Sequence, residues 1–316
     1  MDVIALGELL IDFVSTETGV SVADAPAFEK APGGAPANVA VGLAKLGTDA
    51  AFMGKIGDDE FGHFLANVLR DHGVNTDPLR YTDEANTMLA FVAVDTDGER
   101  TFTFYRNPSA DMLFEPDEVD ADAIRRARIL HIGSITLISE PAGEATRHAA
   151  QVAGEAGTLL SYDPNLRLPL WPDEGTARAG ILSMWPQADL VKVSDEELLF
   201  LTGVADEAAA VESLWHDRLK LLVVTKGRKG STYYTSAFHG DVPSFEVDTV
   251  DTTGAGDGFV AGLLHRLLAN DLPFGSEADI RDAVRYGNAV GASTTIRRGA
   301  IPALPTPDQV STLFDR

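Results

Sequence analysis

Short apolar runs alternate with helical segments along most of this chain, and this alternation constrains the fold more than any other feature. Each run is four or five residues long, too short for a helix, and is bounded by polar or glycine-containing turns. Strands that alternate with helices pack as a parallel sheet with helices on both faces. We therefore predict an α/β fold of one domain, residues 1–316, built on a doubly wound, mostly parallel sheet. Its strands are expected at residues 3–6, 50–53, 129–132, 159–162, 190–193 and 221–225.

Residues 87–105 depart from this alternation because they hold two extended segments with no helix between them. The turn between the segments, Asp95-Thr96-Asp97-Gly98, is typical of a hairpin. In the second segment two phenylalanines alternate with threonines, so one face is apolar. We predict a small β-sheet lid, formed by about 14–32 and 86–107 and inserted in the α/β core. Its apolar face needs a cover, which could be the substrate site or a second subunit.

Polar residues gather directly after several of the predicted strands. In a doubly wound sheet the carboxyl ends of the strands meet at one edge, and ligands bind beyond that edge. A single polar cluster would be unremarkable, but four in register favour one cleft. The clusters are Asp163-Pro164-Asn165, Ser194-Asp195-Glu196-Glu197, Thr225-Lys226-Gly227 and the segment that starts at Asp251.

The stretch Asp251-Thr252-Thr253-Gly254-Ala255-Gly256-Asp257 precedes an apolar helix that we expect from Gly258 to Asn270. Its small residues leave successive amide N–H groups open at the start of that helix. The positive end of the helix dipole lies there too, so the turn suits an anion. Asp257 adds little to anion binding, but it could accept a proton from a group beside a bound phosphate. The pattern predicts a phosphoryl-transfer site.

Three other features are candidate ligand contacts, and each also has a structural explanation. Gly33 and Gly34 precede a helix, where paired glycines let the backbone approach a ligand. Asp12 lies inside an apolar run, where a carboxylate needs either a ligand or a hydrogen-bonded turn. The last long helix, expected at 280–295, carries Asn288 among small residues. That arrangement suits either a flat ligand or close packing of helices.

The charge of the chain limits its partners. The net charge of −23 argues against nucleic acid or an anionic membrane surface as a partner. Only seven of the 25 basic residues are lysine, and such a surface indicates either a salt-adapted source or an acidic mesophile protein. The chain has no cysteine, no apolar run near ~20 residues and no basic stretch in its first residues. We expect a cytoplasmic protein.

Two signatures of this chain resemble those of the ribokinase-like sugar kinases, also called PfkB carbohydrate kinases. The N-terminal signature consists of residues 33–47 and 54–62, and the C-terminal signature is residues 251–258. The similarity covers essentially the whole chain in the expected order. It implies a ribokinase-like fold, ATP and Mg²⁺ as cofactors, and phosphorylation of D-fructose to fructose 6-phosphate. The segments most similar to fructokinases within that family are 32–40, 104–112 and 163–171.

The resemblance also implies roles for individual residues. Asp257 matches the general base, and the amides of Gly254, Ala255 and Gly256 match the anion hole. Ser194 and Glu197 stand at the two ends of the Asn-x-x-Glu motif of the family. There the Glu acts through water on Mg²⁺, while Ser in place of Asn shortens the nucleotide contact. Sugar contacts match Asp12, Gly33, Gly34, Asn38 and, more loosely, Glu140; nucleotide contacts match Thr225, Gly227 and Asn288.

Many members of this family bind K⁺ beside the anion hole, mostly through backbone carbonyl groups. Ala303 stands where some relatives place a serine hydroxyl, so this cation site is left open here. The matching positions are Asp251, Thr253, Thr294, Arg297 and Gly299.

Other functions remain as alternatives. In a 2-keto-3-deoxygluconate kinase of the same family, Arg106 and Arg167 would hold the carboxylate of the sugar acid. Ribokinase and nucleoside kinase are further alternatives, as is a sugar-binding protein without catalysis, although Asp257 and the glycine-rich turn are intact. The P-loop pattern Gly-x-x-x-x-Gly-Lys-Ser/Thr is absent from the sequence, which excludes the P-loop kinases. We expect the lid to close over the sugar and to pair with its twin in a homodimer.

Overall fold

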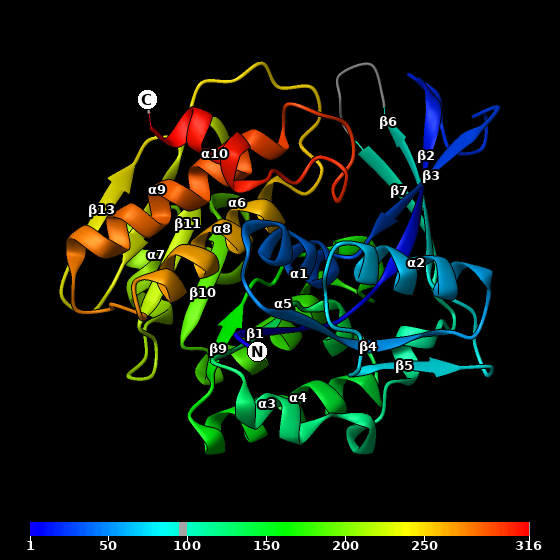
Figure 1. Cartoon of the computed structure of the whole chain (residues 1–316), viewed down its shortest axis with the longest axis horizontal. Coiled ribbons are helices and arrows are strands. Elements are labelled where there is room, and N and C mark those ends of the chain that lie inside the picture. Colours follow the sequence, from blue (N-terminus) through cyan, green and yellow to red (C-terminus); the bar gives the residue numbers. More distant parts are fainter. Residues whose placement is uncertain (95–99, 316) are drawn as a thin grey trace.

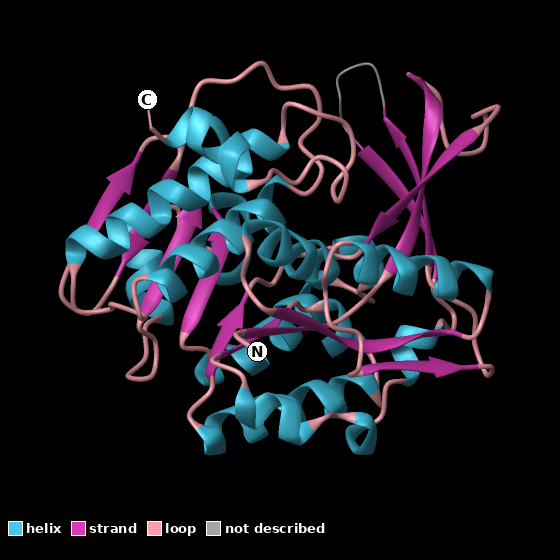
Figure 2. Cartoon of the chain, in the orientation of Figure 1, coloured by secondary structure: helices cyan, strands magenta, loops and turns pink. Residues whose placement is uncertain are grey.

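The main sheet of the molecule is long and almost entirely parallel (Figures 1 and 2). The computed structural model describes residues 1–94 and 100–315. The pairs between β5 and β11 are parallel, while β12 and β13 join one edge as an antiparallel hairpin. The predicted doubly wound sheet is therefore confirmed. Within the described residues its order is β13 (His239–Val242), β12 (Ser231–Tyr234), β11 (Leu221–Thr225), β10 (Leu190–Ser194), β9 (Leu159–Tyr162), β8 (Ile129–Ile132), β1 (Val3–Leu6), β4 (Ala50–Gly57) and β5 (Leu79–Thr82).

Helices cover both faces of this sheet because apolar side chains alternate between its two sides. Ile4 and Leu6 of β1 point into one core, whereas Val3 and Ala5 point to the opposite side. The first core is covered by α3 (Ala121–Arg126), α4 (Ala142–Ala156), α5 (Glu174–Met184), α6 (Asp195–Thr202) and α7 (Glu207–Leu214). The opposite side is covered by α1 (Ala35–Leu46), α2 (Glu60–Asp71), α8 (Ala255–Ala269) and α9 (Glu277–Thr294), with α10 (Pro307–Phe314) packed on α9.

A second, smaller sheet rises beside the carboxyl edge of the first (Figure 1). Its order is β3 (Phe28–Gly33), β2 (Leu10–Thr18), β6 (Leu89–Val94) and β7 (Arg100–Tyr105), with β2 and β6 parallel and the outer pairs antiparallel. This is the predicted lid sheet. Its strand β2 starts at Leu10, so Asp12 belongs to the lid rather than to the core. The predicted turn Asp95-Thr96-Asp97-Gly98 lies outside the described residues.

The two faces of the lid sheet carry different side chains. Directly opposed residues share a face, which places Asp12, Ala90 and Phe104 together. Ala90 and Phe104 also join a cluster with Leu170, which follows β9 in the core, so this face turns toward the carboxyl edge of the main sheet. The other face carries the aromatic residues Phe13 and Phe91 and packs partly on α2.

Several element boundaries differ from the expected ones. Helix α8 begins at Ala255, three residues before the expected start, because Gly254 already adopts the left-handed conformation of a cap. The long helix expected at 280–295 is α9, which begins earlier, after the cap Ser276. Gly47 ends α1 in the left-handed conformation. No helix in the described part of the chain is both long and apolar enough to cross a membrane.

Candidate active site at the carboxyl edge of the sheet

Helix α8 begins at the carboxyl edge of the sheet, directly after Gly254. Gly254 has a φ of 74°, and a Cβ at this position would lie 2.8 Å from the Cβ of Ala300. Only glycine therefore fits this turn without strain. The amide of Ala255 donates to the carbonyl of Thr252 at 3.2 Å, and the amides of Gly256 and Asp257 follow in the first helical turn. Such amides lack acceptors within the helix, so this helix end can receive an anion.

Lys192 brings a full positive charge to the same place. A Cβ built on Gly256 would lie 3.3 Å from the Nζ atom of Lys192, so the ammonium group faces the helix end. This Nζ lies 3.2 and 3.1 Å from the two carboxylate oxygens of Asp163. Burial alone would lower the pKa of Lys192, but the carboxylates of Asp163 and Glu197 outweigh burial and raise it. Lys192 therefore carries its charge at neutral pH.

Asp163 is the buried partner of Lys192. Burial raises the pKa of the Asp163 carboxyl to about 6, although Lys192 acts in the opposite direction. The nearby carboxylates of Glu197 and Asp257 raise this pKa as well. Because a pKa of about 6 is still below neutral pH, the pair carries both charges at pH 7 and above. The buried ion pair leaves the site with a cation fixed beside the helix end.

Asp257 lies in the first turn of α8, with only 7% of its surface exposed. Its Oδ2 atom accepts a hydrogen bond from the carboxamide of Asn38 at 2.7 Å, and its Oδ1 atom accepts one from Asn165 at 3.3 Å. Burial raises the pKa of Asp257, while the bond from Asn38 and the charges of Arg167 and Lys192 act against burial. The carboxylate is thus held on both oxygens and is more basic than an exposed Asp.

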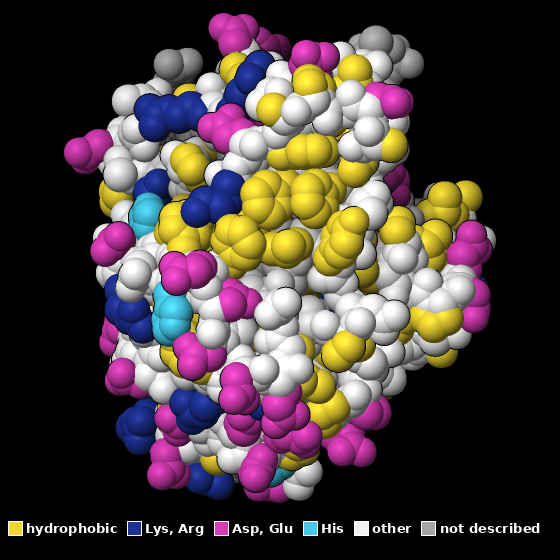
Figure 3. Space-filling view, turned by 90° about the vertical axis from the view of Figure 1, so that its right-hand side faces the viewer, with side chains coloured by type: hydrophobic (Ala, Val, Ile, Leu, Met, Phe, Trp, Pro, Cys, Tyr) yellow, Lys and Arg dark blue, Asp and Glu magenta, His cyan; other side chains and the backbone are white. Residues whose placement is uncertain are grey.

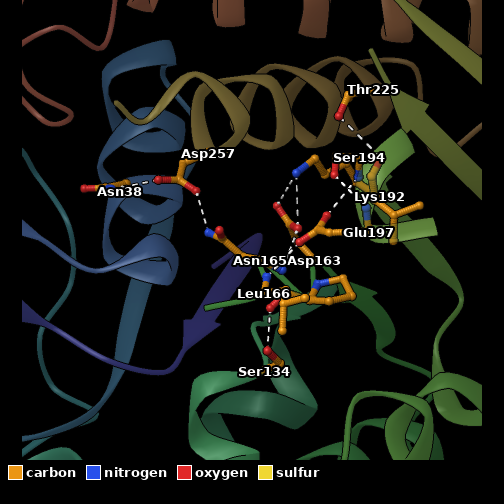
Figure 4. A network of polar contacts seen from close by, with 12 residues as sticks. Asn38, Ser134, Asp163, Asn165, Leu166, Lys192, Ser194, Glu197, Thr225 and Asp257 are labelled. Carbon is orange, nitrogen blue, oxygen red and sulfur yellow. Dashed lines mark hydrogen bonds and ion pairs between the residues drawn. The ribbon is translucent and has the colours of Figure 1, made fainter. Parts of the chain in front are cut away.

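The loop after β9 connects Asp257 to the strand-end polar cluster of β10 (Figure 4). Asn165 has a φ of 46°, in the left-handed region, and points its carboxamide at Asp257. The amide of Leu166 donates to Glu197 at 2.7 Å, and the other carboxylate oxygen of Glu197 accepts from the amide of Ser194 at 2.8 Å. The Ser194 hydroxyl in turn accepts from the amide of Glu197 at 3.0 Å. Ser194 and Glu197 therefore form a capping box at the start of α6.

A cavity of about 420 Å³ opens beside this loop. It has the size expected for a small-molecule site. The predicted residues Ser194 and Glu197 line it together with Lys192 and Arg167, so a single cavity joins residues from the ends of β9 and β10. Its wall is formed by Asn165, Leu166, Arg167, Lys192, Ser194, Glu196, Glu197 and Phe200.

The other predicted nucleotide positions have structural partners. The Thr225 hydroxyl donates to the carbonyl of Val193 at 3.3 Å, and Gly227 begins a short turn with a φ of 55°. The Asn288 side chain is buried and donates to the carbonyl of Val242 at 3.1 Å. It also accepts from the hydroxyl of Ser231. These bonds join α9 to the antiparallel hairpin, so Asn288 has a clear packing role.

The predicted sugar contacts meet where the lid joins the core. A Cβ built on Gly33 would lie 2.3 Å from a carboxylate oxygen of Asp12, so the two residues are in direct contact across β2 and β3. Gly34 has a φ of 109°, and a Cβ there would lie 2.4 Å from the carbonyl oxygen of Glu8. The Oδ1 atom of Asn38 is buried and has no hydrogen-bond partner within the described residues. An unsatisfied acceptor beside Asp257 is suited to a substrate hydroxyl.

Arg106 and Glu140 are bound to other residues of the chain. The guanidinium of Arg106 pairs with Asp111 at 2.9 Å, and both side chains are almost fully buried. Glu140 is exposed at the start of α4, where it accepts from the amide of Glu144 at 2.6 Å and pairs with Arg147. The structure therefore does not bring either residue into contact with Asp257. Arg167, in contrast, lies close enough for its charge to lower the pKa of Asp257.

The predicted cation positions come from two loops that lie side by side. The carboxylate of Asp251 accepts from the amide of Thr253 and from the amide of Gly299, each at 2.9 Å. The amide of Asp251 donates to the carbonyl of Thr295, next to Thr294. Arg297 lies on the second loop, and Ala303 is buried. Among residues 1–94 and 100–315, no group of three or more His, Asp or Glu side chains is placed to hold a metal ion.

Four residues of this site carry interactions that the sequence did not assign to them: Asp163, Asn165, Lys192 and Glu8. Lys192 is a lysine inside the apolar strand β10, and a charge in a buried strand is a signal that it needs a partner. Asp163 and Asn165 were recognised as polar residues at a strand end, without a specific role. Glu8 follows Gly7 directly after β1, and its isolation in an apolar segment was the available signal.

Glu8 links the two segments through which the chain passes between the core and the lid, one before β2 and one after β3. Its side chain accepts from the amide of Ala35 at 2.9 Å, at the start of α1, and only 2% of the residue is exposed. Burial raises the pKa of Glu8 to about 7, although backbone amides lower it. The carboxyl group therefore changes its charge near neutral pH in a position that links the segment before β2 to the segment after β3.

A lid beside the carboxyl edge of a doubly wound sheet, with a buried carboxylate at a helix N-terminus, is the architecture of the ribokinase-like carbohydrate kinases. The chain belongs to the pfkB family carbohydrate kinases, whose profile matches residues 1–307. It is therefore a carbohydrate kinase.

Individual relatives and solved structures agree with this assignment over the full length. Probable fructokinase-4 of Arabidopsis thaliana is 57% identical over 315 residues, which cover 99% of this chain and 96% of the relative. The structure of a fructokinase from Xylella fastidiosa with bound ATP has a TM-score of 0.91 at 36% identity and covers 99% and 98% of the two chains. A double mutant of the Vibrio cholerae O395 fructokinase, with fructose, ADP and potassium ion bound, has a TM-score of 0.89 at 34% identity, with 99% and 98% covered.

Proposed function

We propose that this protein is a fructokinase, which transfers the γ-phosphoryl group of ATP to the 6-hydroxyl group of D-fructose. The observation that carries this proposal is the 57% identity to a probable fructokinase over 99% of the chain. Neighbours that bind ATP, or fructose with ADP, over nearly the whole fold support the same pair of substrates.

Asp257 is the general base in this proposal. Its buried carboxylate accepts the proton of the sugar hydroxyl as that oxygen attacks phosphorus in line. The first-turn amides of α8 and the Nζ atom of Lys192 then face the negative charge that develops on the transferred group. Phosphoryl transfer depends on positioning and charge stabilisation, so these groups suffice without a covalent intermediate.

Mg²⁺ fits the cavity as an ion held mainly by phosphate oxygens and water. Mg²⁺ commonly uses only one or two carboxylates of a protein, and Glu197 offers one at the cavity wall. Glu197 would hold the ion through water, because both of its oxygens already accept backbone hydrogen bonds. When bound, the ion would neutralise charge on the phosphates.

We also place K⁺ between the two loops beside the start of α8. The fit rests on the short separation of these loops, which the bond from Gly299 to Asp251 maintains. Because the carboxylate of Asp251 is occupied by amides, the ligands would be mainly carbonyl oxygens. They would come from Asp251, Thr253, Thr294, Arg297 and Gly299.

The lid closes over the sugar in this proposal, and its outer face forms a homodimer. The inner face would bring Asp12 to the sugar, and closure would exclude water as a competing acceptor. The outer face is rich in aromatic rings, with Phe13 stacked on Phe91 and Phe91 against Tyr105. Figure 3 shows hydrophobic side chains gathered on this side of the molecule. Tyr105 is 63% exposed, so an apolar partner would cover it.

The acidic surface supports the proposal that the protein is adapted to high salt. With a net charge of −23, the folded chain repels itself at low ionic strength, and salt screens this repulsion. We expect the Tm to rise steadily between low salt and molar KCl, measured by scanning calorimetry. An unchanged Tm would identify an acidic protein without salt adaptation. The cytoplasmic location remains a prediction.

The substrate assignment is tested by ADP release with fructose, 2-keto-3-deoxygluconate, ribose and adenosine, each with and without KCl. We expect the highest kcat/KM with fructose and a stimulation by KCl. The sugar-acid alternative loses one of its two arginines as a free ligand, because Arg106 is committed to its buried pair with Asp111. Preferential turnover of the sugar acid would nevertheless overturn the fructokinase proposal.

A further inference from the structure

The backbone of Asn165 is strained, and neither the turn nor the cavity fully explains why an asparagine stands at this position. Its φ of 46° lies in the left-handed region, which costs energy for any residue other than glycine. Asparagine tolerates this region better than most residues, and so does aspartate. Glycine would form the same turn with less strain, so the presence of asparagine indicates that its carboxamide group has a function.

The carboxamide is directed at the reacting carboxylate. Its Nδ2 atom lies 3.3 Å from the Oδ1 atom of Asp257, while Asn38 holds the Oδ2 atom at 2.7 Å (Figure 4). A carboxylate with a donor on each oxygen cannot rotate freely about its χ2 angle. One remaining lone-pair direction can then point at the acceptor hydroxyl, as a general base requires.

The loop that carries Asn165 is fixed on both sides. The hydroxyl of Ser134 donates to the carbonyl of Pro164 at 2.6 Å, and the amide of Leu166 donates to Glu197 at 2.7 Å. The amide of Asn165 itself donates to Asp163 at 3.2 Å. The position of the carboxamide is therefore set by the segment after β8 and by α6 as well as by the loop itself.

We propose that Asn165 is a positioning residue for the phosphoryl-transfer reaction: it orients Asp257 and ties this orientation, through Leu166, to Glu197 on the cavity wall. The inference rests on the proposed role of Asp257 as the base. Asn165 does not need to touch either substrate. A change at the Glu197 end of the loop reaches the base through one backbone amide and one side chain.

Two substitutions separate this role from a role in the turn. Asn165→Gly removes the carboxamide and keeps a residue that prefers the left-handed region, while Asn165→Asp keeps the shape but removes the donor. If Asn165 served the turn alone, both variants would behave as the parent protein. Asp271→Gly is the matched control, because Asp271 is also a non-glycine residue in the left-handed region, with a φ of 57°, and forms an exposed pair with Arg128.

We expect kcat to fall about 10-fold to 100-fold in Asn165→Gly, with KM values for sugar and ATP changed less than about threefold, because a misplaced base slows the chemical step without weakening binding. In both variants the acid limb of kcat against pH should move to higher pH, since a donor to the ionised form of Asp257 is lost. The shift should be larger in Asn165→Asp, where a second carboxylate faces the first. The charges of Arg167, Lys192, Asp163 and Glu197 around Asp257 are the same in every variant.

The inference would be overturned if both variants kept the kcat and the pH profile of the parent protein. It would also be overturned if the KM for ATP rose while kcat stayed the same, because Asn165 would then be a nucleotide ligand. A readout independent of turnover is the side-chain amide signal of Asn165 in ¹⁵N-labelled protein, identified by its loss in Asn165→Gly. The shift of this signal with pH should be much smaller in Asp257→Asn than in the parent protein, although the carboxyl of Asp163, which accepts from the backbone amide of Asn165, still titrates nearby in both. If fructose proves not to be the substrate, this titration still tests the contact, so failure of the substrate proposal and failure of this inference are distinguishable.

Discussion

The core and the lid are built differently around the predicted site residues. On the core side, polar residues hold one another in buried bonds, as Asp257 does with Asn38 and Lys192 does with Asp163. On the lid side, Asp12 stands on a small sheet that is joined to the core through short crossings around Glu8 and Gly34. Groups that stabilise developing charge are most effective when they do not move. Under the proposed function, the groups that act on the phosphoryl group are therefore preorganised in the core, whereas Asp12 contacts the sugar from the lid.

The largest expected effect is on the core side, in Asp257→Asn. The variant keeps the shape of the side chain but cannot accept a proton, so kcat should fall roughly 10²-fold to 10⁴-fold. The KM for ATP should stay near that of the parent protein, measured by steady-state ADP release. Near-normal turnover would remove Asp257 from the role of base and would weaken the contrast between a catalytic core and a binding lid.

The substitution Lys192→Met should destabilise the folded core. It leaves the buried carboxylate of Asp163 without its partner, and such a loss typically costs about 3–5 kcal/mol of unfolding free energy. Denaturant unfolding of this variant measures the loss. The double variant Lys192→Met, Asp163→Asn removes both charges and should recover most of the stability. A loss below about 1 kcal/mol in the single variant would mean that the pair is well solvated.

The pH dependence of stability tests the role of Glu8, which lies where the chain passes between the core and the lid. The pKa of Glu8 is about 7 in the folded protein and 4.5 in the unfolded chain, so the folded state binds more protons between these values. Stability should therefore fall as the pH rises from 4.5 to 7 and stay at the lower level above pH 7. At about 1.4 kcal/mol per pH unit, the loss due to Glu8 is about 3 kcal/mol.

The matched variant is Glu8→Gln, which keeps an acceptor for the amide of Ala35 but has no charge. Its stability relative to the parent protein should rise by about 3 kcal/mol between pH 4.5 and 7, because the parent loses that amount. Asp163 and Asp257 also have raised pKa values, but they are common to both proteins and cancel in the difference. A difference that does not change with pH, in urea unfolding at several pH values, would refute the buried titration of Glu8.

The smallest catalytic effect is expected on the outer face of the lid. Tyr105→Ser should weaken self-association about tenfold or more in sedimentation velocity, because exposed tyrosines at the centre of an interface carry much of its binding energy. Its kcat should change little, because Tyr105 lies on the face of the lid sheet opposite to Asp12. A parent protein that sediments as a monomer at all working concentrations would rule out the dimer and leave the lid as a closing element only.

Much of the fold was accessible from the sequence because apolar runs mark buried strands. The runs at Val3–Leu6, Ile129–Ile132 and Leu159–Tyr162 have the same bounds in the structure, since each is buried on both faces of a parallel sheet. The hairpin formed by Ser231–Tyr234 and His239–Val242 was not recognised, because an edge strand such as β13 is partly exposed and its sequence is largely polar.

The site was predicted unevenly for a similar reason. Residues near a helix end, such as Asp257 and Gly254, belong to a local pattern, which one segment of sequence displays. Arg106 and Glu140 are also predicted to contact the substrate, and in the structure each is paired with an opposite charge a few residues away, Asp111 and Arg147 respectively. A charged side chain can pair with an opposite charge nearby in the sequence, so its charge alone does not identify it as a ligand contact.

The sequence by itself determined the doubly wound sheet, the presence of a small second sheet and the glycine-rich start of α8, since each follows from local spacing of apolar and small residues. Only the tertiary structure decided that Asn38, Asn165 and Lys192 converge on that helix end from three other elements. Their convergence depends on strand order and helix packing, because these residues are far from α8 along the chain; Asn165 and Asn38 lie 92 and 219 positions from Asp257. The charge and the hydrogen bonding of the Asp257 carboxylate therefore depend on the assembled edge of the sheet, not on the local motif that contains Asp257.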